Sequence, residues 1–372
     1  MKKLLYVAAL PINFDKFNGV AKKVLSHIKV FKEEFDSYLL CYHENKVLLV
    51  HGDDKQEIMK GKNGYDVLRA IKKINIYFDN IYIRYPKSSP FFLAFLKKVK
   101  GSKIVVEIPT YPYDSEGYET FVSRIQKIMD GHYRKKINKY VDRIVTYSDD
   151  DEIFGIKTIK TINGIDFENT KISKPIAKDG VYHFIAVSNM YEINGFERLI
   201  IGLDDYYKKK SDTKIYFDIV GDGPSKRDYE KIVTDHNLNE YVIFHGLKFG
   251  DDLNLIYDKA VLGVNSLAIH RHNLKKESTL KTKEYGAKGL LIVSSSEVDS
   301  FTNDGKDNFV FMVKPDDSAL DIAMIVDFVK KSLSNFNGSE CLKKMIRCDS
   351  KEACDMKKTL VPVINFFNEK RV

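Results

Sequence analysis

The chain has 372 residues, of which 44% are hydrophobic and 30% charged, and its formal net charge is +8 at pH 7. This length exceeds what one hydrophobic core usually holds, so we expect two domains of about 150 to 200 residues each. The apolar content excludes a disordered chain, and no apolar run reaches the roughly 20 residues of a membrane span. The four cysteines have neither metal-ligand spacing nor a disulfide framework, so we expect a cytoplasmic protein without a metal site.

The positive charge is concentrated in the first half of the chain. Residues 1–170 hold 29 Lys and Arg against 22 Asp and Glu, while residues 171–372 hold 31 against 30. A basic surface can meet an anionic membrane or a phosphorylated substrate, or simply keep a protein in solution. Because no nucleic-acid recognition motif accompanies it, we expect no nucleic-acid partner.

In chain order, apolar patterns predict strands at 4–10, 38–42, 47–51, 80–84, 103–108 and 143–147, with helices at 19–34, 66–74, 90–99 and 117–141. The second half repeats this rhythm, with strands at 182–187, 214–220, 241–245, 261–266 and 290–293 and helices at 195–209, 226–236, 251–259 and 278–288. The alternation predicts an α/β protein with two doubly wound, Rossmann-like sheets in tandem. Pro and Gly between residues 172 and 180 mark the boundary. The expected domains are therefore residues 1–172 and 178–350, followed by a helical tail, 351–372, that packs back on the first domain.

The helix predicted at 278–288 has the features of a site for a nucleotide diphosphate. It follows a short apolar strand, and Gly289 ends it before the next strand. Ligands of open parallel sheets bind at the carboxyl ends of the strands, where the helix start offers free N–H groups and Lys281 and Lys283 add charge. Glu284 is free to accept hydrogen bonds from sugar hydroxyls. Alternatively, these lysines are ordinary surface residues.

Two glycines follow the strand at 214–220. Gly221 and Gly223 let the backbone approach a ligand where a side chain would clash. The alternative is a tight turn that needs glycine for its dihedral angles.

The sequence resembles the GT-B glycosyltransferases, specifically the retaining family 4 type of bacterial polysaccharide assembly. The resemblance is strongest over residues 184–294, through the segments Phe196–Ile200, Ile219–Pro224, Val242–Gly246 and Leu280–Tyr285, and the first half adds Gly19 and the segment Thr161–Asp166. It implies a nucleotide-sugar donor of the UDP or GDP type on the second domain, an acceptor on the first, reaction in the cleft between them, and no metal or other cofactor.

The resemblance also assigns donor-site residues. Glu284 matches a family carboxylate that binds ribose, and Glu277 lies one residue from the position of its partner, which binds the sugar. Asn189 and Asn194 occupy positions where relatives place an Arg and a Lys against the diphosphate, so Lys281 and Lys283 become the expected replacements, helped by N–H groups near the helix start. The expected catalytic group is Glu277, Lys281 and Lys283, and the expected donor-binding group is Gly19, Asn189, Asn194, Gly221, Gly223, Ser278, Thr279, Leu280 and Glu284.

The acceptor is expected at the segment that follows the strand 103–108. This segment lacks the His of many relatives, and it offers Glu107, Tyr111, Tyr113 and Asp114. Aromatic faces stack on sugar rings, and carboxylates bind hydroxyls. Alternatively, Glu107 is a buried strand carboxylate paired with Arg84.

The helix 117–141 has a basic face and apolar residues at helical spacing, which is typical of contact with anionic lipid; the alternative is a core helix. Because acceptors of such relatives are commonly lipid-linked, we expect transfer of a sugar to a lipid-linked or oligosaccharide acceptor at the cytoplasmic membrane face. Two alternatives stay open: a GT-B enzyme of another type, either an epimerase or an inverting transferase, and a non-catalytic GT-B subunit that stabilises an active partner.

Overall fold

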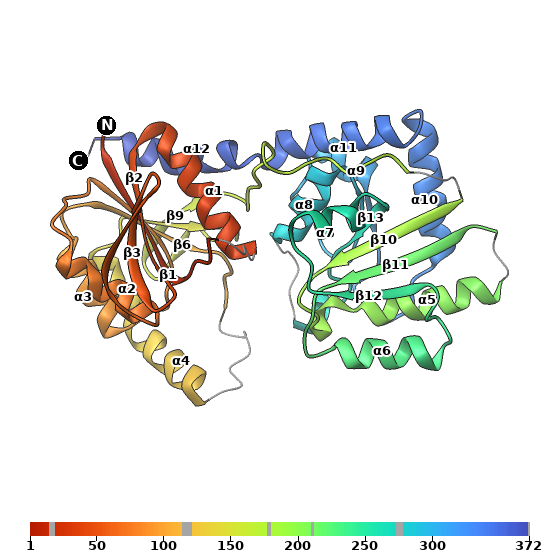
Figure 1. Cartoon of the computed structure of the whole chain (residues 1–372), viewed down its shortest axis with the longest axis horizontal. Helices are drawn as coiled ribbons and strands as arrows, with labels where there is room; N and C mark the ends of the chain where they lie inside the picture. The colour runs from red at the N-terminus through yellow and green to blue at the C-terminus, as the bar shows by residue number, and fades with distance from the viewer. Residues whose placement is uncertain (15–18, 114–120, 177–179, 210–211, 273–277, 371–372) are drawn as a thin grey trace. The chain divides into compact units, whose positions relative to one another are not determined.

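The chain forms two compact units (Figure 1). In this computed structural model, residues 1–14, 19–113, 121–176, 180–209, 212–272 and 278–370 are described. One unit comprises Met1–Ile162 and Met356–Val372, and the other comprises Asn163–Asp355. The chain enters the second unit before the predicted boundary at 172–180, because Ser173 and Ile176 already donate backbone hydrogen bonds to Lys288 and Ser339 of that unit.

The first unit is built on a nine-stranded sheet of order β4-β3-β2-β1-β5-β6-β7-β9-β8. Its strands are β1 (Lys3–Pro11), β2 (Asp36–His43), β3 (Lys46–His51), β4 (Asp54–Lys60), β5 (Asn80–Arg84), β6 (Lys103–Ile108), β7 (Arg143–Thr146), β8 (Glu152–Ile153) and β9 (Ile156–Lys160). The strands from β2 through β1, β5, β6 and β7 to β9 pair in parallel, and β3, β4 and β8 are antiparallel additions. The sequence did not predict β4, β8 or β9. β4 is mostly exposed and polar, so it lacks the apolar alternation of a half-buried strand.

Helices cover both faces of this sheet. They are α1 (Gly19–Glu34), α2 (Gly64–Ala70), α3 (Pro90–Lys98), α4 (Phe121–Tyr133) and α12 (Met356–Asn368), with short 3-10 turns η1 (Ile71–Lys73) and η2 (Arg134–Lys139). α1 and α12 share a core with Tyr6 of β1, while α2 and α3 pack on the other side with Val7. The helix predicted at 117–141 is divided into α4 and η2, and its first residues lie outside the described part of the chain.

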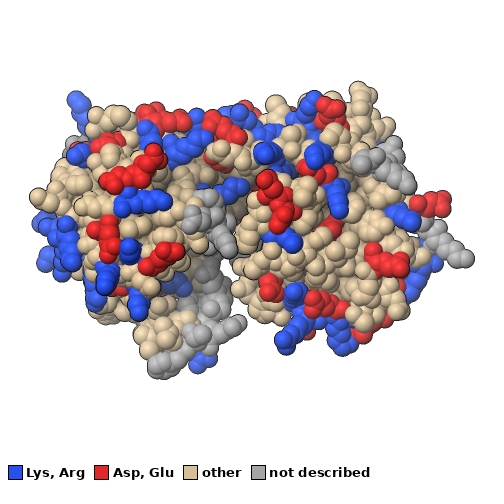
Figure 2. Space-filling view, viewed as in Figure 1, with Lys and Arg blue, Asp and Glu red and all other residues tan. Residues whose placement is uncertain are grey.

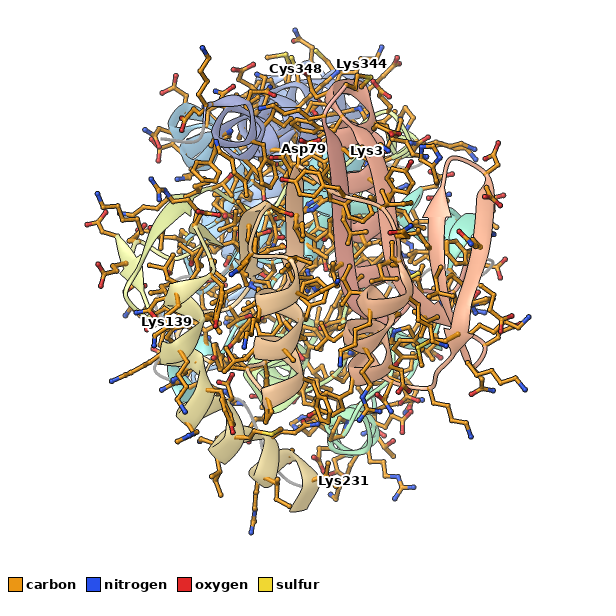
Figure 3. All side chains as sticks on the ribbon, turned by 90° about the vertical axis from the view of Figure 1, so that its left-hand side faces the viewer. Lys3, Asp79, Lys139, Lys231, Lys344 and Cys348 are labelled. Carbon is orange, nitrogen blue, oxygen red and sulfur yellow. The ribbon has the colours of Figure 1, made fainter. Side chains whose placement is uncertain are left out.

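Hydrogen bonds hold the end of α12 and the start of β1 at the amino ends of the strands of the first sheet. Lys103 donates through Nζ to the carbonyl oxygens of Phe366 and Glu369, each over 2.7 Å, and Lys2 donates to that of Phe367 over 2.9 Å. These lysines satisfy carbonyl groups that the last turn of a helix leaves without partners. At the same edge, the backbone N–H of Lys3 donates to Asp79 over 2.8 Å (Figure 3).

The second unit is built on a six-stranded, all-parallel sheet of order β12-β11-β10-β13-β14-β15. Its strands are β10 (Val181–Val187), β11 (Lys214–Val220), β12 (Val242–Gly246), β13 (Ala260–Val264), β14 (Leu291–Ser294) and β15 (Val310–Met312). The predicted fold class, α/β with two doubly wound, Rossmann-like sheets, is confirmed.

The helices of the second unit follow the same alternation. They are α5 (Phe196–Lys208), α6 (Lys226–Asp235), α7 (Gly250–Tyr257), α8 (Leu280–Lys288), α9 (Asn303–Phe309), α10 (Ile322–Asn335) and α11 (Ser339–Cys354), with the 3-10 turns η3 (Glu192–Asn194) and η4 (Ile269–His272). Gly289 ends α8 in the left-handed conformation, as the sequence predicted. α8 packs beside α11, and α5 packs beside α10.

Each sheet has one point where the strand order reverses direction, between β1 and β5 in the first unit and between β10 and β13 in the second. Ligands of open α/β sheets bind beyond the carboxyl ends of the strands at such a point. No helix in the described part of the chain is long and apolar enough to cross a membrane. On the surface, charges of both signs are interspersed, and Lys and Arg gather along the left-hand margin of the first unit (Figure 2).

Candidate functional site

The reversal point of the second sheet is fixed by Tyr285 of α8. Its hydroxyl accepts a hydrogen bond from the backbone N–H of Val187 over 3.0 Å and donates to the carbonyl oxygen of Val264 over 3.2 Å, so it joins the ends of β10 and β13. A Cβ atom on Gly263 would lie 2.3 Å from the Tyr285 ring. Glycine in β13 therefore lets α8 lie close to the strands, which places the start of the helix at their carboxyl edge.

Lys281 extends from α8 to this edge. Its ammonium donates to the hydroxyl of Ser266, two residues beyond β13, over 2.8 Å. Asn265, which precedes Ser266, is buried and donates from its side chain to Ser294 over 2.9 Å. The Oδ1 atom of Asn265 has no partner among the described residues. The N-cap residue of α8, Thr279, makes no side-chain capping hydrogen bond, and the first turn has no acidic residue, so the amino-terminal N–H groups add to a positive potential. This combination can bind a phosphate.

Glu284 is half-buried and lies three residues after Lys281, so both side chains fall on one side of α8. It neighbours the hydroxyl of the fully buried Tyr257. Burial, with the charge of Glu284 as a second cause, raises the pKa of Tyr257 well above its ordinary value. Lys281 and Glu284 together offer one cation and one hydroxyl-binding carboxylate at the reversal point.

Lys283 does not share that position. Its side chain is fully buried, forms an ion pair with Asp299, and donates to the hydroxyl of Ser278 over 3.1 Å. The expectation that Lys283 neutralises a diphosphate is corrected accordingly, because its charge is already matched inside the unit. Arg271, a further cation of this region, is likewise engaged by Glu197 at 2.5 Å and Asp317 at 2.7 Å.

The two asparagines that replace the expected basic pair differ in exposure. Asn194 is buried, accepts from the backbone N–H of Tyr191 over 2.7 Å, and donates to Ser188 over 3.1 Å. It therefore closes the loop after β10, which is a structural role and not the predicted donor contact. Asn189 is exposed at the same loop.

Gly221 and Gly223 follow the end of β11 and have φ values of 131° and 153°. Added Cβ atoms would lie 2.0 Å from the carbonyl oxygen of Ser188 and 2.4 Å from that of Met190. The loop after β10 occupies the space that the missing side chains leave open. The close approach of the loop after β10 accounts for these glycines, and their positive φ values agree with the tight-turn alternative.

The start of α8 is held by Asn163, which lies in the segment Thr161–Asp166 of the resemblance but was not assigned to the site. Asn163 donates from its backbone N–H to the hydroxyl of Ser278 over 3.0 Å, and from its side chain to the carbonyl oxygen of Ser278. Thr279 and Leu280 are half-buried at the first turn. Glu277, the expected sugar-binding carboxylate, lies outside the described residues.

In the first unit, Glu107 is fully buried and does not face an acceptor. Its Oε1 is 2.5 Å from the ammonium of Lys23 and accepts from the hydroxyl of Tyr147 over 2.5 Å, and it lies 3.6 Å from Arg84. Burial alone opposes ionisation, but the charges of Lys23 and Arg84 hold the pKa of Glu107 well below its usual range. Glu107 is therefore a buried strand carboxylate near Arg84, as in the alternative. Lys23 is its closer partner, which sequence spacing could not reveal.

The other expected acceptor residues are spread over different environments. Tyr113 is buried, and its hydroxyl donates to Asp130 over 2.7 Å, so it is part of the core near α3. Tyr111 is half-buried against the ring of Phe154. Asp114 lies outside the described residues. Gly19 is exposed at the first position of α1.

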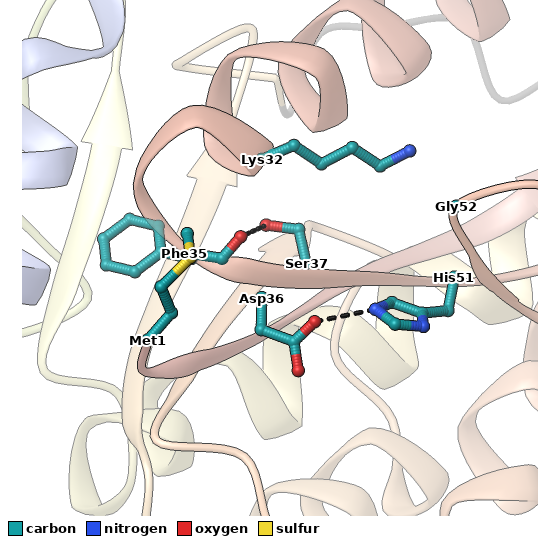
Figure 4. Close-up of a pocket in the computed structure, with 7 residues that line it drawn as sticks. All are labelled: Met1, Lys32, Phe35, Asp36, Ser37, His51 and Gly52. Atoms are coloured by element: carbon teal, nitrogen blue, oxygen red, sulfur yellow. Dashed lines mark hydrogen bonds and ion pairs between the residues drawn. The ribbon is translucent and has the colours of Figure 1, made fainter.

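A separate pocket of about 530 Å³ opens at the amino ends of β1 and β2 (Figure 4). It is lined by Met1, Lys32, Phe35, Asp36, Ser37, His51 and Gly52. Inside it, His51 and Asp36 are joined by a 2.7 Å hydrogen bond. This edge is opposite to the one at which open parallel sheets bind their ligands. Among the described residues, no group of three or more His, Cys, Asp or Glu side chains is placed to hold a metal ion.

In both units the strands of a Rossmann-like sheet alternate along the chain with helices. This arrangement defines the class of protein as a two-domain GT-B fold. Sucrose-phosphate synthase from Thermosynechococcus elongatus matches with a TM-score of 0.66 at 11% identity, over 99% of this chain and 98% of that chain. HepE of Anabaena, solved with UDP, matches with a TM-score of 0.59 at 14% identity, over 99% and 97%. The pneumococcal O-GlcNAc transferase GtfA, solved with UDP and GlcNAc, matches with a TM-score of 0.54 at 14% identity over 90% of this chain, which spans only 65% of GtfA.

Residues 182–329 match the model of the family "Glycosyl transferases group 1". This match lies within the second unit and covers about 40% of the chain. The matched segment contains the reversal point of the second sheet, with Lys281 and Glu284. A search of curated protein sequences found no significant match.

Proposed function

We propose that this protein transfers a sugar, with retention of configuration, from a nucleotide-diphosphate donor to a lipid-linked or oligosaccharide acceptor. The observation that carries the proposal is the contact between Lys281 and Ser266 at the β10/β13 reversal point. It brings a cation, the open start of α8 and a carboxylate, Glu284, to the edge where a nucleotide diphosphate binds in such a sheet.

In this proposal Lys281 and the first N–H groups of α8 bind the diphosphate. Glu284 accepts hydrogen bonds from the ribose hydroxyls, and Asn265 offers a free acceptor beside them. Charge that develops on the leaving diphosphate is stabilised by the same fixed donors, which removes the need for a metal ion. The UDP in the GtfA and HepE structures favours uridine as the base.

A thermal-shift panel with UDP, GDP, ADP and CDP tests the donor site. At 100 times its dissociation constant a ligand stabilises a folded protein by about 2.7 kcal/mol. We expect UDP to raise the melting temperature of the wild type, and we expect Glu284→Ala to reduce that shift. Glu297→Ala serves as the matched control, because Glu297 is an exposed carboxylate of the same unit. A panel without any shift would contradict the proposal.

We also propose that α4 meets an anionic membrane on its cytoplasmic side, where a lipid-linked acceptor would be found. Val122, Ile125 and Ile128 are 63%, 48% and 75% exposed, and they recur at spacings of three residues along the helix. Arg124 and Lys127 are exposed between them. An apolar stripe beside basic residues suits the headgroup boundary of a bilayer, and the exposure of the stripe argues against the alternative of a core helix.

Co-sedimentation with vesicles tests this membrane contact. The wild type should bind vesicles that contain phosphatidylglycerol more tightly than vesicles of phosphatidylcholine alone, and less tightly at high salt. Replacing Ile125 and Ile128 by Ser should weaken binding. Replacing the exposed Leu255 of α7 by Ser is the control. Equal binding by wild type and the Ile125/Ile128 double variant would show that α4 is not the contact.

A second candidate is a non-catalytic subunit, which the buried Asn194 and the internally paired Lys283 favour because both reduce the charge available to a diphosphate. Hydrolysis of a UDP-sugar by the isolated protein separates the two candidates. Release of UDP by wild type, absent in Lys281→Ala, excludes the non-catalytic role.

A further inference from the structure

The guanidinium of Arg84 lies at the reversal point of the first sheet and donates no hydrogen bond to any described residue. Arg84 is the last residue of β5, directly beside β1. Its NH1 group is buried without an acceptor, and its ion partner, Glu107, is 3.6 Å away, which is too far for a hydrogen bond. A guanidinium carries five N–H donors. Oε2 of Glu107 is also buried without a partner, so this ion pair leaves both a donor and an acceptor unsatisfied. Buried donors are nearly always satisfied in folded proteins, so an Arg in this state indicates room for a further acceptor.

Glu107 has closer partners than Arg84. Lys23 and Tyr147 already bind Oε1 of Glu107, each over 2.5 Å, so the buried carboxylate is held by closer partners. Arg84 therefore has N–H donors without an acceptor at the carboxyl end of β5. NH1 is buried, but the side chain as a whole keeps 15% of its surface exposed, so another part of it is open to solvent.

We propose that Arg84 binds a phosphate group of the acceptor substrate. The planar fork of a guanidinium matches two phosphate oxygens at once, and it does so better than it matches a neutral hydroxyl. The position fits, because the β1/β5 reversal point is where a ligand of this sheet binds. The first half of the chain also carries nearly all of the excess positive charge, which attracts anions.

This inference deepens the proposed function and rests on it, since the first unit is taken as the acceptor unit. It names a phosphate ester as the acceptor class. The ester can be a soluble sugar phosphate or the phosphate of a lipid-linked acceptor, and the test below separates these sources.

The test is calorimetric titration of the full-length protein, saturated with UDP so that the donor site is filled. Glucose 1-phosphate is the probe and glucose its uncharged counterpart. We expect the phosphate ester to bind at least tenfold more tightly than glucose. Arg84→Gln should raise its dissociation constant at least tenfold, and Arg84→Lys should give a smaller loss, because lysine keeps the charge but loses the fork. Arg69→Gln, a change of the same charge on the exposed face of α2, should have no effect.

A second arm replaces the sugar phosphate by vesicles of phosphatidylcholine with or without about 30 mol% phosphatidic acid, whose phosphate monoester is borne by a lipid. If Arg84 is needed only for binding the vesicles with phosphatidic acid, the phosphate belongs to a lipid-linked acceptor. If Arg84 is needed only for binding glucose 1-phosphate, the phosphate belongs to a soluble acceptor. The inference is overturned if neither phosphate binds, if Arg84→Gln and Arg84→Lys bind both as wild type does, or if the variants lose UDP and not the phosphate ester. Failure of the wild type to bind UDP would instead contradict the proposed function. Circular dichroism confirms that each variant is folded.

Discussion

The ammonium of Lys283 is buried in an ion pair with the carboxylate of Asp299, whereas the ammonium of Lys281, two residues earlier, lies at the strand edge against Ser266. Residues two apart on a helix point in different directions. Two lysines that are equivalent in the sequence therefore separate into one that forms an internal ion pair and one that reaches the strand edge.

We predict that Lys283→Met destabilises the protein by about 3 to 5 kcal/mol, because it leaves the charge of Asp299 buried without a partner. Chemical unfolding followed by circular dichroism measures the loss. The double variant Lys283→Met/Asp299→Leu should recover part of it, since no charge is then left unpaired. A double variant as unstable as the two single changes added together would show that the pair is not coupled.

Lys281→Ala should leave stability nearly unchanged and weaken UDP binding. Hydrogen bonds to charged groups contribute about 1.5 to 3 kcal/mol, so we expect the dissociation constant to rise by about a factor of ten or more. Isothermal titration measures it. Lys231→Ala is the control, because the Lys231 side chain is 74% exposed on α6 and forms an ion pair with Asp235. If Lys281→Ala binds UDP as tightly as this control does, Lys281 is not a phosphate ligand.

The fold class could be predicted from the sequence because the fold consists of strands and helices that each have a local apolar pattern. Apolar runs such as those of β5, β6 and β11 bury both faces of a parallel strand and are easily recognised. Gly289 ended α8 where predicted. The polar β4 and the two-residue β8 carry too little of this pattern, and only pairing with a neighbouring strand reveals them.

The site was only partly predictable, because burial and partners depend on residues far apart in the chain. Glu107 lies 84 positions from Lys23, and the contact of Asn163 with Ser278 spans 115 positions. No spacing rule links such residues. Lys281 and Glu284 could be assigned to one side of a helix from helix geometry alone, and their role in binding a donor stays a prediction.

Lys103 should be a main anchor of α12. Replacing it by Met removes two hydrogen bonds to backbone carbonyl groups, at Phe366 and Glu369, and leaves the end of the helix unsatisfied. We expect a loss of about 2 to 3 kcal/mol and faster amide exchange in α12. Lys357→Met, which breaks a half-exposed ion pair with Glu33 at 2.8 Å, should cost less than about 1 kcal/mol. Equal losses in the two variants would contradict the anchoring role.

His27 should make the first unit sensitive to acid. Burial lowers the pKa of His27 to about 3 from an ordinary 6.5, with the nearby charges of Glu107, Lys23 and Arg84 as smaller influences. Between these two values the unfolded chain binds a proton that the folded chain does not. The free energy of unfolding therefore falls as the pH drops through 6.5, by up to about 1.4 kcal/mol per pH unit from this residue.

The variant His27→Phe isolates this contribution. Phenylalanine fits among Tyr6, Phe31 and Tyr82, which surround the imidazole ring, and it cannot take up a proton in either state. Measured between pH 8 and pH 4.5, its unfolding free energy should fall less steeply than that of the wild type, so that the difference between the two proteins grows toward acid pH. Parallel curves for wild type and variant over this range would mean that the imidazole of His27 gains its proton in the folded protein as readily as in the unfolded chain.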